Sequence, residues 1–266
     1  MAVEYRKRYG INFRDLTMER EIPEILSGQD VADKVEKVFD KILPDLASGL
    51  IESNVVLTMA ALKPSSDFFV DLKSVEDAKR LEAEVAKLNE LLNDKLINFR
   101  TGGKPFIAAS DKRLTLMLGV DNLVGWERMT KTTKISGVPK FDHKLGWEGF
   151  EKWYPSFVKS VKKAQQMGEI PAKYEVIGGL MHGYPDQAIY DFEDWRNTGK
   201  KKKMVESQIP YTGTYKEAEP NYDFSPEHAN DPQIQENIKI AGKVLEGFYK
   251  SKWHKKVAKS LKKETR

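Results

Sequence analysis

Residues 66–110 read SDFFVDLKSVEDAKRLEAEVAKLNELLNDKLINFRTGGKPFIAAS, and this stretch decides the fold. Its first seven residues alternate between two kinds of side chain, with Phe68, Val70 and Leu72 on one side and Asp67, Phe69 and Asp71 on the other. Such alternation predicts a strand with one buried face. From Ser74 the apolar positions recur every three or four residues, which predicts a helix over 74–93. Ser74 and Asp77 have the spacing of a capping box that uses Asp in place of Glu.

Two β-rich runs follow this helix, KLINFR at 95–100 and PFIAAS at 105–110, separated by Thr101-Gly102-Gly103-Lys104. Two such runs across a Gly-Gly segment predict a hairpin. The region therefore has the predicted order strand, helix, strand, strand. A short helix is predicted next, over residues 111–119, ending at Gly119.

Upstream, apolar residues at helical spacing predict a helix over 30–48, capped by Asp30, with its last turn disturbed by Pro44. The apolar run 54–62 fits either a buried strand or a helical turn. These elements together predict an α+β fold, in which a small mixed β-sheet within 54–110 is packed by helices in the N-terminal half.

The C-terminal half is predicted to be mostly helical, after an irregular, aromatic-rich segment over 120–153. Pro155 is expected to open a helix. Residues 171–196 are expected to form a helix–turn–helix pair, with Gly183 in the left-handed region and Pro185 starting the second helix. We expect an α+β region over 1–119 and a mostly helical region over 120–266. No linker marks their boundary, so the two regions can also form one continuous domain.

The composition excludes several classes of protein. The chain has 266 residues and no cysteine, so disulfides, thiolate nucleophiles and Cys-ligated metals are excluded. The N-terminus lacks the apolar segment of a signal peptide, and no run approaches the ~18 apolar residues of a membrane span. We therefore expect a soluble, cytoplasmic protein. Common nucleotide-binding, protease and hydrolase motifs are absent from the sequence.

Positive charge is concentrated at the C-terminus. Residues 250–266 contain eight basic residues and one acidic residue, so the rest of the chain is slightly acidic although the net charge is +4. In a helix, Trp253, Val257 and Leu261 would share one side and lysines would cover the remainder. Such a helix can bind RNA, DNA or an acidic protein surface. The alternatives are membrane-surface contact and a last helix packed on the body with solvated lysines. The candidate polyanion-binding residues are Lys252, Lys255, Lys256, Lys259, Lys262 and Lys263, together with Lys200 and Lys201.

A second candidate site lies around His182, which precedes the Gly183 turn and is followed in the next helix by four carboxylates, Asp186, Asp191, Glu193 and Asp194. Histidine with carboxylates can transfer protons or hold a divalent metal. The alternative is that His182 simply ends one helix and Asp186 lies in the favourable first turn of another. His143 lies beside Asp142, but neighbouring residues do not face one another in a regular element.

The aromatic segment offers Trp147 and Trp153 as residues that could stack on bases or sugars between lysines. The alternative is that its large rings pin an irregular stretch to the core. Asp67 and Asp71 share one face of their strand, but we expect a solvated edge and no metal site.

Two functions remain open from the sequence. The first is a non-enzymatic protein that binds a polyanion, either a nucleic acid or an acidic partner, through the basic C-terminal helix. The second is an enzyme without a common motif that uses His182 with nearby carboxylates. The sequence identifies no substrate, cofactor or oligomeric state.

Overall fold

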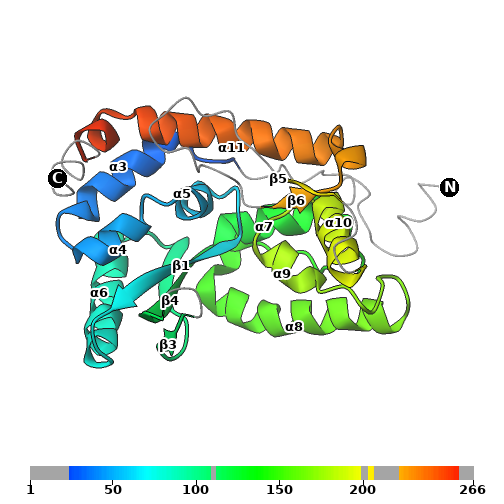
Figure 1. Ribbon diagram of the computed structural model, residues 1–266, viewed down its shortest axis with the longest axis horizontal. Helices are drawn as coiled ribbons and strands as arrows, with labels where there is room; N and C mark the ends of the chain where they lie inside the picture. Colours follow the sequence, from blue (N-terminus) through cyan, green and yellow to red (C-terminus); the bar gives the residue numbers. More distant parts are fainter. Residues whose placement is uncertain (1–23, 109–111, 199–202, 207–221, 258–266) are drawn as a thin grey trace, which may run out of the picture.

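The computed structural model describes residues 24–108, 112–198, 203–206 and 222–257. Its fold is α+β, as predicted, with a small sheet packed by helices (Figure 1). The sheet order is β1-β4-β2, and β3 also pairs with β4. Every pairing in this sheet is antiparallel, where a mixed sheet was expected. The strands are β1 (Ser65–Leu72), β2 (Ile97–Thr101), β3 (Phe106–Ile107) and β4 (Leu114–Asn122).

The predicted alternation in β1 is confirmed, because Phe68 and Val70 are buried whereas Phe69 is 58% exposed. Helix α6 (Glu76–Leu92) also lies where it was predicted. The Asp77 carboxylate accepts a hydrogen bond from the Ser74 backbone N–H at 2.9 Å, which forms half of the expected capping box. Helices α5 (Ser53–Met59) and α6 pack against the sheet and close its apolar face.

The short helix predicted over 111–119 is wrong, because this segment enters the central strand β4. Leu116, Leu118 and Val120 lie at alternate positions of β4 and fill the core beneath the sheet. Leucine and methionine favour helices in isolation, but pairing with neighbours on both sides of β4 overrides that preference.

The predicted hairpin across Gly102 and Gly103 is also wrong. Strands β2 and β3 do not pair with each other, since each pairs with β4. The Gly102 N–H donates to the Met117 carbonyl at 2.7 Å, so the glycines interrupt one edge of the sheet without reversing the chain. The reversal lies between β3 and β4, where Ile107 pairs with Leu114.

The single helix predicted over 30–48 is two helices, α3 (Gly28–Phe39) and α4 (Pro44–Gly49). Ser27, and not Asp30, caps α3; Asp30 completes a capping box by accepting from the Ser27 backbone. Pro44 starts α4, because a proline lacks the N–H that a continuous helix would need there.

The segment predicted to be irregular contains helix α7 (Leu123–Thr132), and α8 (Gly146–Gln166) begins in it. Pro155 lies inside α8 and does not open a helix. The predicted helix–turn–helix is present as α9 (Val176–Met181) and α10 (Asp186–Asn197). Gly183 has the expected positive φ of 67°, and Pro185 occupies the N-cap of α10, one position before the expected one.

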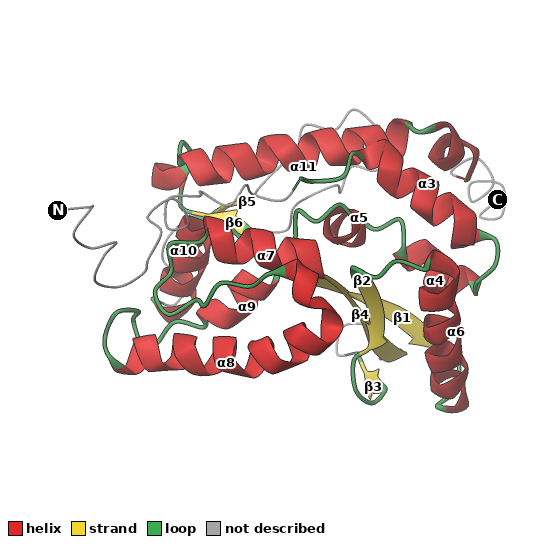
Figure 2. Ribbon diagram, turned by 180° about the vertical axis from the view of Figure 1, so that it is seen from behind, coloured by secondary structure: helices red, strands yellow, loops and turns green. Residues whose placement is uncertain are grey.

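Helix α11 (Pro232–Lys250) extends across both halves of the molecule beside α3 (Figures 1 and 2). A Cβ atom on Gly28 would lie 1.9 Å from the Val244 carbonyl oxygen, so only glycine permits this approach of α3 to α11. Through Leu245 and Phe248, α11 joins the core of the sheet. Its Ile234 packs instead near the small sheet formed by β5 (Val205–Glu206) and β6 (Asp223–Phe224).

Residues 252–257 are helical and pack back on the body. The Trp253 ring lies 5.2 Å from that of Phe39 and 5.9 Å from that of Phe248, and Val257 is also buried. In the part of the chain that the structure describes, no helix has the length and apolar character needed to cross a membrane.

Candidate functional site

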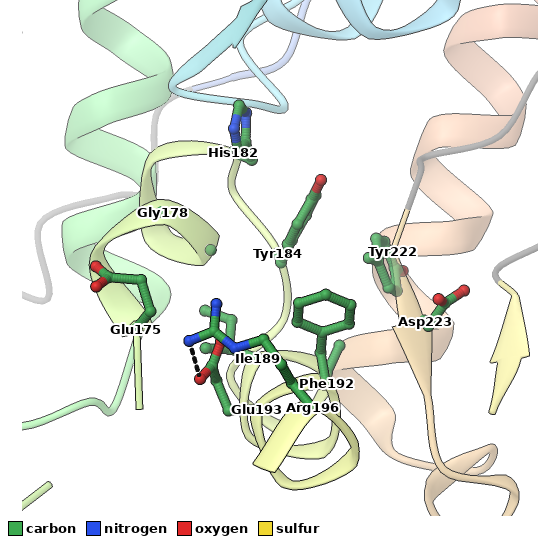
Figure 3. A pocket seen from close by; sticks show the side chains of 12 residues that line it. Glu175, Gly178, His182, Tyr184, Ile189, Phe192, Glu193, Arg196, Tyr222 and Asp223 are labelled. Atoms are coloured by element: carbon green, nitrogen blue, oxygen red, sulfur yellow. Dashed lines mark hydrogen bonds and ion pairs between the residues drawn. The ribbon is translucent and has the colours of Figure 1, made fainter. Parts of the chain in front are cut away.

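A cavity of about 380 Å³ lies between α9, α10 and β6, and we refer to it as the α9–α10 cavity. Its size is within the usual range of ~300–1,000 Å³ for small-molecule sites. Figure 3 shows His182 at one end and the side chains of Glu193 and Arg196 at the other. The lining residues are Glu175, Gly178, Gly179, His182, Tyr184, Ala188, Ile189, Phe192, Glu193, Arg196, Tyr222 and Asp223.

Aromatic rings form much of the cavity wall. The Tyr184 ring lies 5.6 Å from the His182 ring at 29°, and 5.5 Å from the Tyr222 ring. Phe192 is 39% exposed although it is apolar. Burial raises the pKa of Tyr184 to about 12, and nearby Asp223 adds to this effect. The Tyr184 phenol therefore stays neutral at physiological pH.

The polar groups of the wall are mostly acidic. Glu193 is buried and accepts a hydrogen bond from Arg196 at 2.8 Å, as an ion pair across one turn of α10. Glu175 and Asp223 also line the cavity. The wall therefore has three carboxyl groups and one guanidinium group.

The C-cap of α9 places His182 at the inner end of the cavity. Burial lowers the pKa of His182 below its ordinary value, and the charge of Lys63 acts in the same direction. Asp67 and a hydrogen bond with the Ser65 backbone oppose this shift without reversing it. The imidazole is therefore neutral at pH 7, which is the form that accepts protons.

Lys63 packs against the Tyr184 ring without lining the cavity, and it is only 3% exposed. Its Nζ donates to Asn54 Oδ1 at 2.6 Å and lies 5.2 Å from the centre of the Tyr184 ring. Burial lowers the pKa of Lys63 to about 7.

The sheet contributes a further set of charged groups close to His182. Arg100 on β2 donates through Nε to Asp121 on β4 at 2.7 Å, and its Nη2 lies 3.6 Å from Asp67 on β1. Burial raises the pKa of Asp121, and Arg100 offsets part of the shift. We call Lys63, Asp67, Arg100 and Asp121 the charge cluster; Lys63 and Asp121 are buried, and Asp67 and Arg100 are half-buried. Strongly perturbed ionisable groups beside a cavity are typical of functional sites.

Asp186 is used elsewhere in the fold. Its carboxylate accepts hydrogen bonds at 2.7 Å from the Thr133 hydroxyl and the Lys134 backbone N–H, and it does not line the α9–α10 cavity. These bonds fasten the start of α10 to the segment after α7. The structure therefore places His182, without Asp186, at the cavity.

His143 belongs to a separate group with Glu127 and Asp142, whose ligand atoms lie within 4.8 Å of one another. Lys131 Nζ lies 2.6 Å from one Glu127 carboxylate oxygen, and His143 is bonded to the other. Burial opposes ionisation of Glu127, but the hydrogen bonds of Lys131 and His143 lower its pKa to about 2. Both carboxylate oxygens thus already have partners, and the group needs no metal ion to be stable.

Trp147 and Trp153, the tryptophans predicted to stack on a ligand, pack against a second hydrophobic core, which lies around α7 and α8. The Trp153 ring stacks on Phe157 at 5.1 Å and 13°, and it also contacts Trp126. Trp147 packs edge-on against Phe150 at 5.7 Å. Both tryptophans are half-buried and pack against other aromatic side chains of the protein.

Three of the candidate lysines of the C-terminal segment are described, and Lys252, Lys255 and Lys256 are all exposed. Within the described residues none of them forms a salt bridge. Lys250, just before them, pairs with Glu246. The other candidates, Lys200, Lys201, Lys259, Lys262 and Lys263, lie outside the described residues.

Sequence reasoning missed Lys63, Arg100 and Tyr222. Lys63 carried a usable signal, because it is a single charge at the end of the apolar run 54–62 and precedes a proline. Arg100 and Tyr222 carried none, since only the strand pairing and the placement of β6 bring them toward His182.

No protein-family model, curated protein or solved structure matches the chain.

Proposed function

We propose that the protein is an enzyme that binds a small organic molecule in the α9–α10 cavity and uses His182 as a proton acceptor. The supporting observation is the position of His182, which lines the cavity on one side and adjoins the charge cluster on the other. A neutral imidazole within hydrogen-bond reach of a bound molecule is a typical general base. Lys63 and Arg100 favour this neutral form, because a second positive charge beside them is costly.

Gly178 provides a direct test of the cavity. A Cβ atom added there would have no atom within 4 Å, so a larger side chain can enter the cavity without displacing the backbone. We expect fragments from a soluble library to shift the amide NMR signals of residues 178–184 in the wild type. The Gly178→Leu variant should lose these shifts, whereas Gly178→Ala should keep most of them. Equal fragment binding by wild type and Gly178→Leu would refute the cavity as the site.

The role of His182 has its own readout. The imidazole should titrate below its usual value near ~6.5 in an NMR pH series, and a bound fragment that donates a hydrogen bond to it should move this pKa. His182→Gln should keep fragment binding and lose the pH dependence of affinity. A His182 that titrates above its usual value would contradict the role of proton acceptor.

A second candidate function is polyanion binding by the C-terminal segment. The observation that favours it is the orientation of residues 252–257, which bury Trp253 and Val257 and leave Lys252, Lys255 and Lys256 exposed. Packing fixes the helix, so three cations are presented together on one surface. Nucleic acid is the polyanion that these lysines suit best, because its phosphates are regularly spaced.

The test measures the affinity for a short DNA duplex against salt concentration. Replacing the three lysines by glutamine should reduce the slope of log K against log salt by about 2–3, at ~0.9 per lost phosphate contact. The matched control replaces Lys159, Lys162 and Lys163 of α8, which are also exposed, and so makes the same change in net charge. An equal effect in both variants would show that general charge, and not the C-terminal segment, governs binding.

A further inference from the structure

The shape of the α9–α10 cavity indicates which class of molecule it takes, and this inference rests on the proposed function. We propose that the cavity takes a flat aromatic ring, which lies against the bare backbone of Gly178 and carries an O–H or N–H group toward His182.

Gly178 is a glycine that the fold itself does not need. Among the glycines in the described part of the chain, it alone has neither a positive φ nor any atom within 4 Å of an added Cβ. Neither backbone conformation nor packing therefore requires glycine at this position, although a glycine inside a helix costs stability relative to alanine. A further reason for glycine is the close approach of a ligand to the backbone.

Gly179, the next residue, does have a packing reason. A Cβ atom there would lie 2.6 Å from Ile189 Cγ1, so this glycine lets α9 pack closely on α10. Both glycines line the cavity. A flat group can thus lie at the van der Waals separation of ~3.5–4 Å from the backbone of Gly178, in the space that a methyl group would fill.

Aromatic rings form other walls of the same cavity. Phe192 comes from α10, and Tyr222 comes from the residue before β6 (Figure 3). Tyr184 comes from the turn after α9. Aromatic rings pack favourably on one another in offset-stacked or edge-to-face arrangements. A space between a bare helix backbone and aromatic rings therefore suits a flat ring better than a puckered aliphatic one.

His182 lies one helical turn after Gly178. Its backbone N–H donates to the Gly178 carbonyl at 3.1 Å, and both residues line the cavity. Residues four apart share one side of a helix, with ~5–6 Å between their Cβ positions. A ring against Gly178 therefore lies next to the imidazole. One nitrogen of the neutral imidazole bonds with the Ser65 backbone, and the other accepts a hydrogen bond, so the ring substituent that suits it is a donor.

Three probes separate flatness from hydrogen bonding. Phenol is flat and has an O–H group, cyclohexanol has the O–H group on a puckered ring, and anisole is flat without a donor. Charged groups of both signs lie in and beside the wall, so all three probes are uncharged at pH 7. Each is titrated into the protein while the amide signals of residues 178–184 are followed by NMR. We expect phenol to bind about threefold to tenfold more tightly than either of the others.

Gly178→Ala tests the contact with the backbone. It should weaken phenol binding by about threefold to tenfold and change cyclohexanol binding little, although the added methyl group should not harm the fold. A variant that is at least as stable as the wild type and binds phenol less tightly cannot owe its loss to damage of the fold. Unchanged phenol affinity in this variant would overturn the role of Gly178.

Two further variants assign the preferences to the wall. Phe192→Leu should reduce the ratio of phenol to cyclohexanol affinity by about threefold. Phe69→Leu is its matched control, because Phe69 is also an exposed ring but lies on β1, outside the cavity. His182→Ala should remove the difference between phenol and anisole and keep the preference for phenol over cyclohexanol.

The outcomes distinguish this inference from the proposed function. Equal affinity for phenol and cyclohexanol would overturn the preference for a flat ring and leave the cavity as a binding site. Gly178→Leu should abolish the binding of all three probes; if it binds them as well as the wild type does, both proposals fail. Binding of none of them by the wild type would overturn the aromatic preference, while the fragment screen decides separately on the cavity.

Discussion

The guanidinium group of Arg100 lies directly over Gly119, its neighbour across the β2–β4 pair. A Cβ atom on Gly119 would come within 2.6 Å of Arg100 Cζ, so the absence of a side chain leaves the space in which Arg100 reaches both Asp67 and Asp121. Strand β4 thus provides both the space, at Gly119, and one carboxylate, at Asp121, while β2 provides Arg100 and β1 provides Asp67.

Arg100→Gln should destabilise the protein at pH 7 by about 2–3 kcal/mol, less than the ~3–5 kcal/mol typical of a fully buried pair, because Arg100 is 36% exposed. The loss leaves Asp121 ionised and nearly buried without its partner. Burial already raises the pKa of Asp121 in the folded state, so the deficit should shrink as the pH falls and Asp121 becomes protonated. Urea unfolding at about pH 7 and about pH 4 measures both effects.

The double variant Arg100→Gln/Asp121→Asn is the control for this prediction. It removes the charge that Arg100→Gln leaves unpaired, so it should recover at least half of the lost stability. A double variant no more stable than Arg100→Gln would mean that the packing of Arg100, and not its charge, stabilises the sheet.

Gly178 and Gly179 should respond oppositely to the same substitution. Gly178→Ala adds a methyl group in open space within a helix and should stabilise the protein by about 0.5–1 kcal/mol. Gly179→Ala places its Cβ 2.6 Å from Ile189 Cγ1 and should destabilise it by about 1–3 kcal/mol. Thermal unfolding measures the change in melting temperature of each variant. A change of both melting temperatures in the same direction would contradict the packing of α9 on α10.

Lys63→Met should stabilise the protein at pH 7 by about 1–4 kcal/mol, as found when buried ions are replaced by apolar groups. Folding lowers the pKa of Lys63 from 10.5 to about 7, so the folded protein binds this proton less tightly than the unfolded chain does. The lowered pKa of Lys63 therefore destabilises the folded protein most below about pH 7. The free energy of unfolding should rise as the pH increases from about 7 toward 10.5. Lys63→Met should lack that rise in denaturant titrations. A variant less stable than wild type at pH 7 would show that the contacts with Asn54 and Tyr184 dominate.

Trp253→Ala should cost about 3–5 kcal/mol, because the indole is buried between Phe39 and Phe248. Lys255→Ala, two residues further along the same helical segment, should change stability by less than about 0.5 kcal/mol, since its side chain is exposed. Chemical unfolding of both variants compares the two faces of the segment. Similar small losses would mean that residues 252–257 are not packed on the body.

The elements that the sequence predicted correctly are those with a strong local pattern. Strand β1 alternates residue by residue, and α6 repeats its apolar positions over several turns, so each can be recognised without its partners. Strand β4 alternates too, but its leucines and its methionine are also good helix formers, and only pairing on both sides decides between the two.

The candidate site was predictable at His182 and at Glu193, one of the carboxylates expected in the next helix. The Gly183 turn follows from local chemistry, so the place of His182 at the end of a helix could be expected. Its neighbours come from β1, β2, β6 and the segment before β1, and their approach depends on strand register and helix packing. Asp186 is close to His182 in the sequence, but its hydrogen-bond partners Thr133 and Lys134 come from the segment after α7. Local sequence spacing does not show this contact.

The close contact of α3 with α11 has a consequence for synthesis of the chain. The ribosome synthesises α3 and the strands early. The surface of α3 around Gly28 stays exposed to water until Gly247 and its neighbours in α11 have been synthesised. Contacts between such distant segments carry a large loop-closure cost and form slowly. The hydrophobic core of the N-terminal half, although this half is translated first, is therefore completed last. A nascent chain that stalls before Ala241 would expose apolar surface that chaperones recognise.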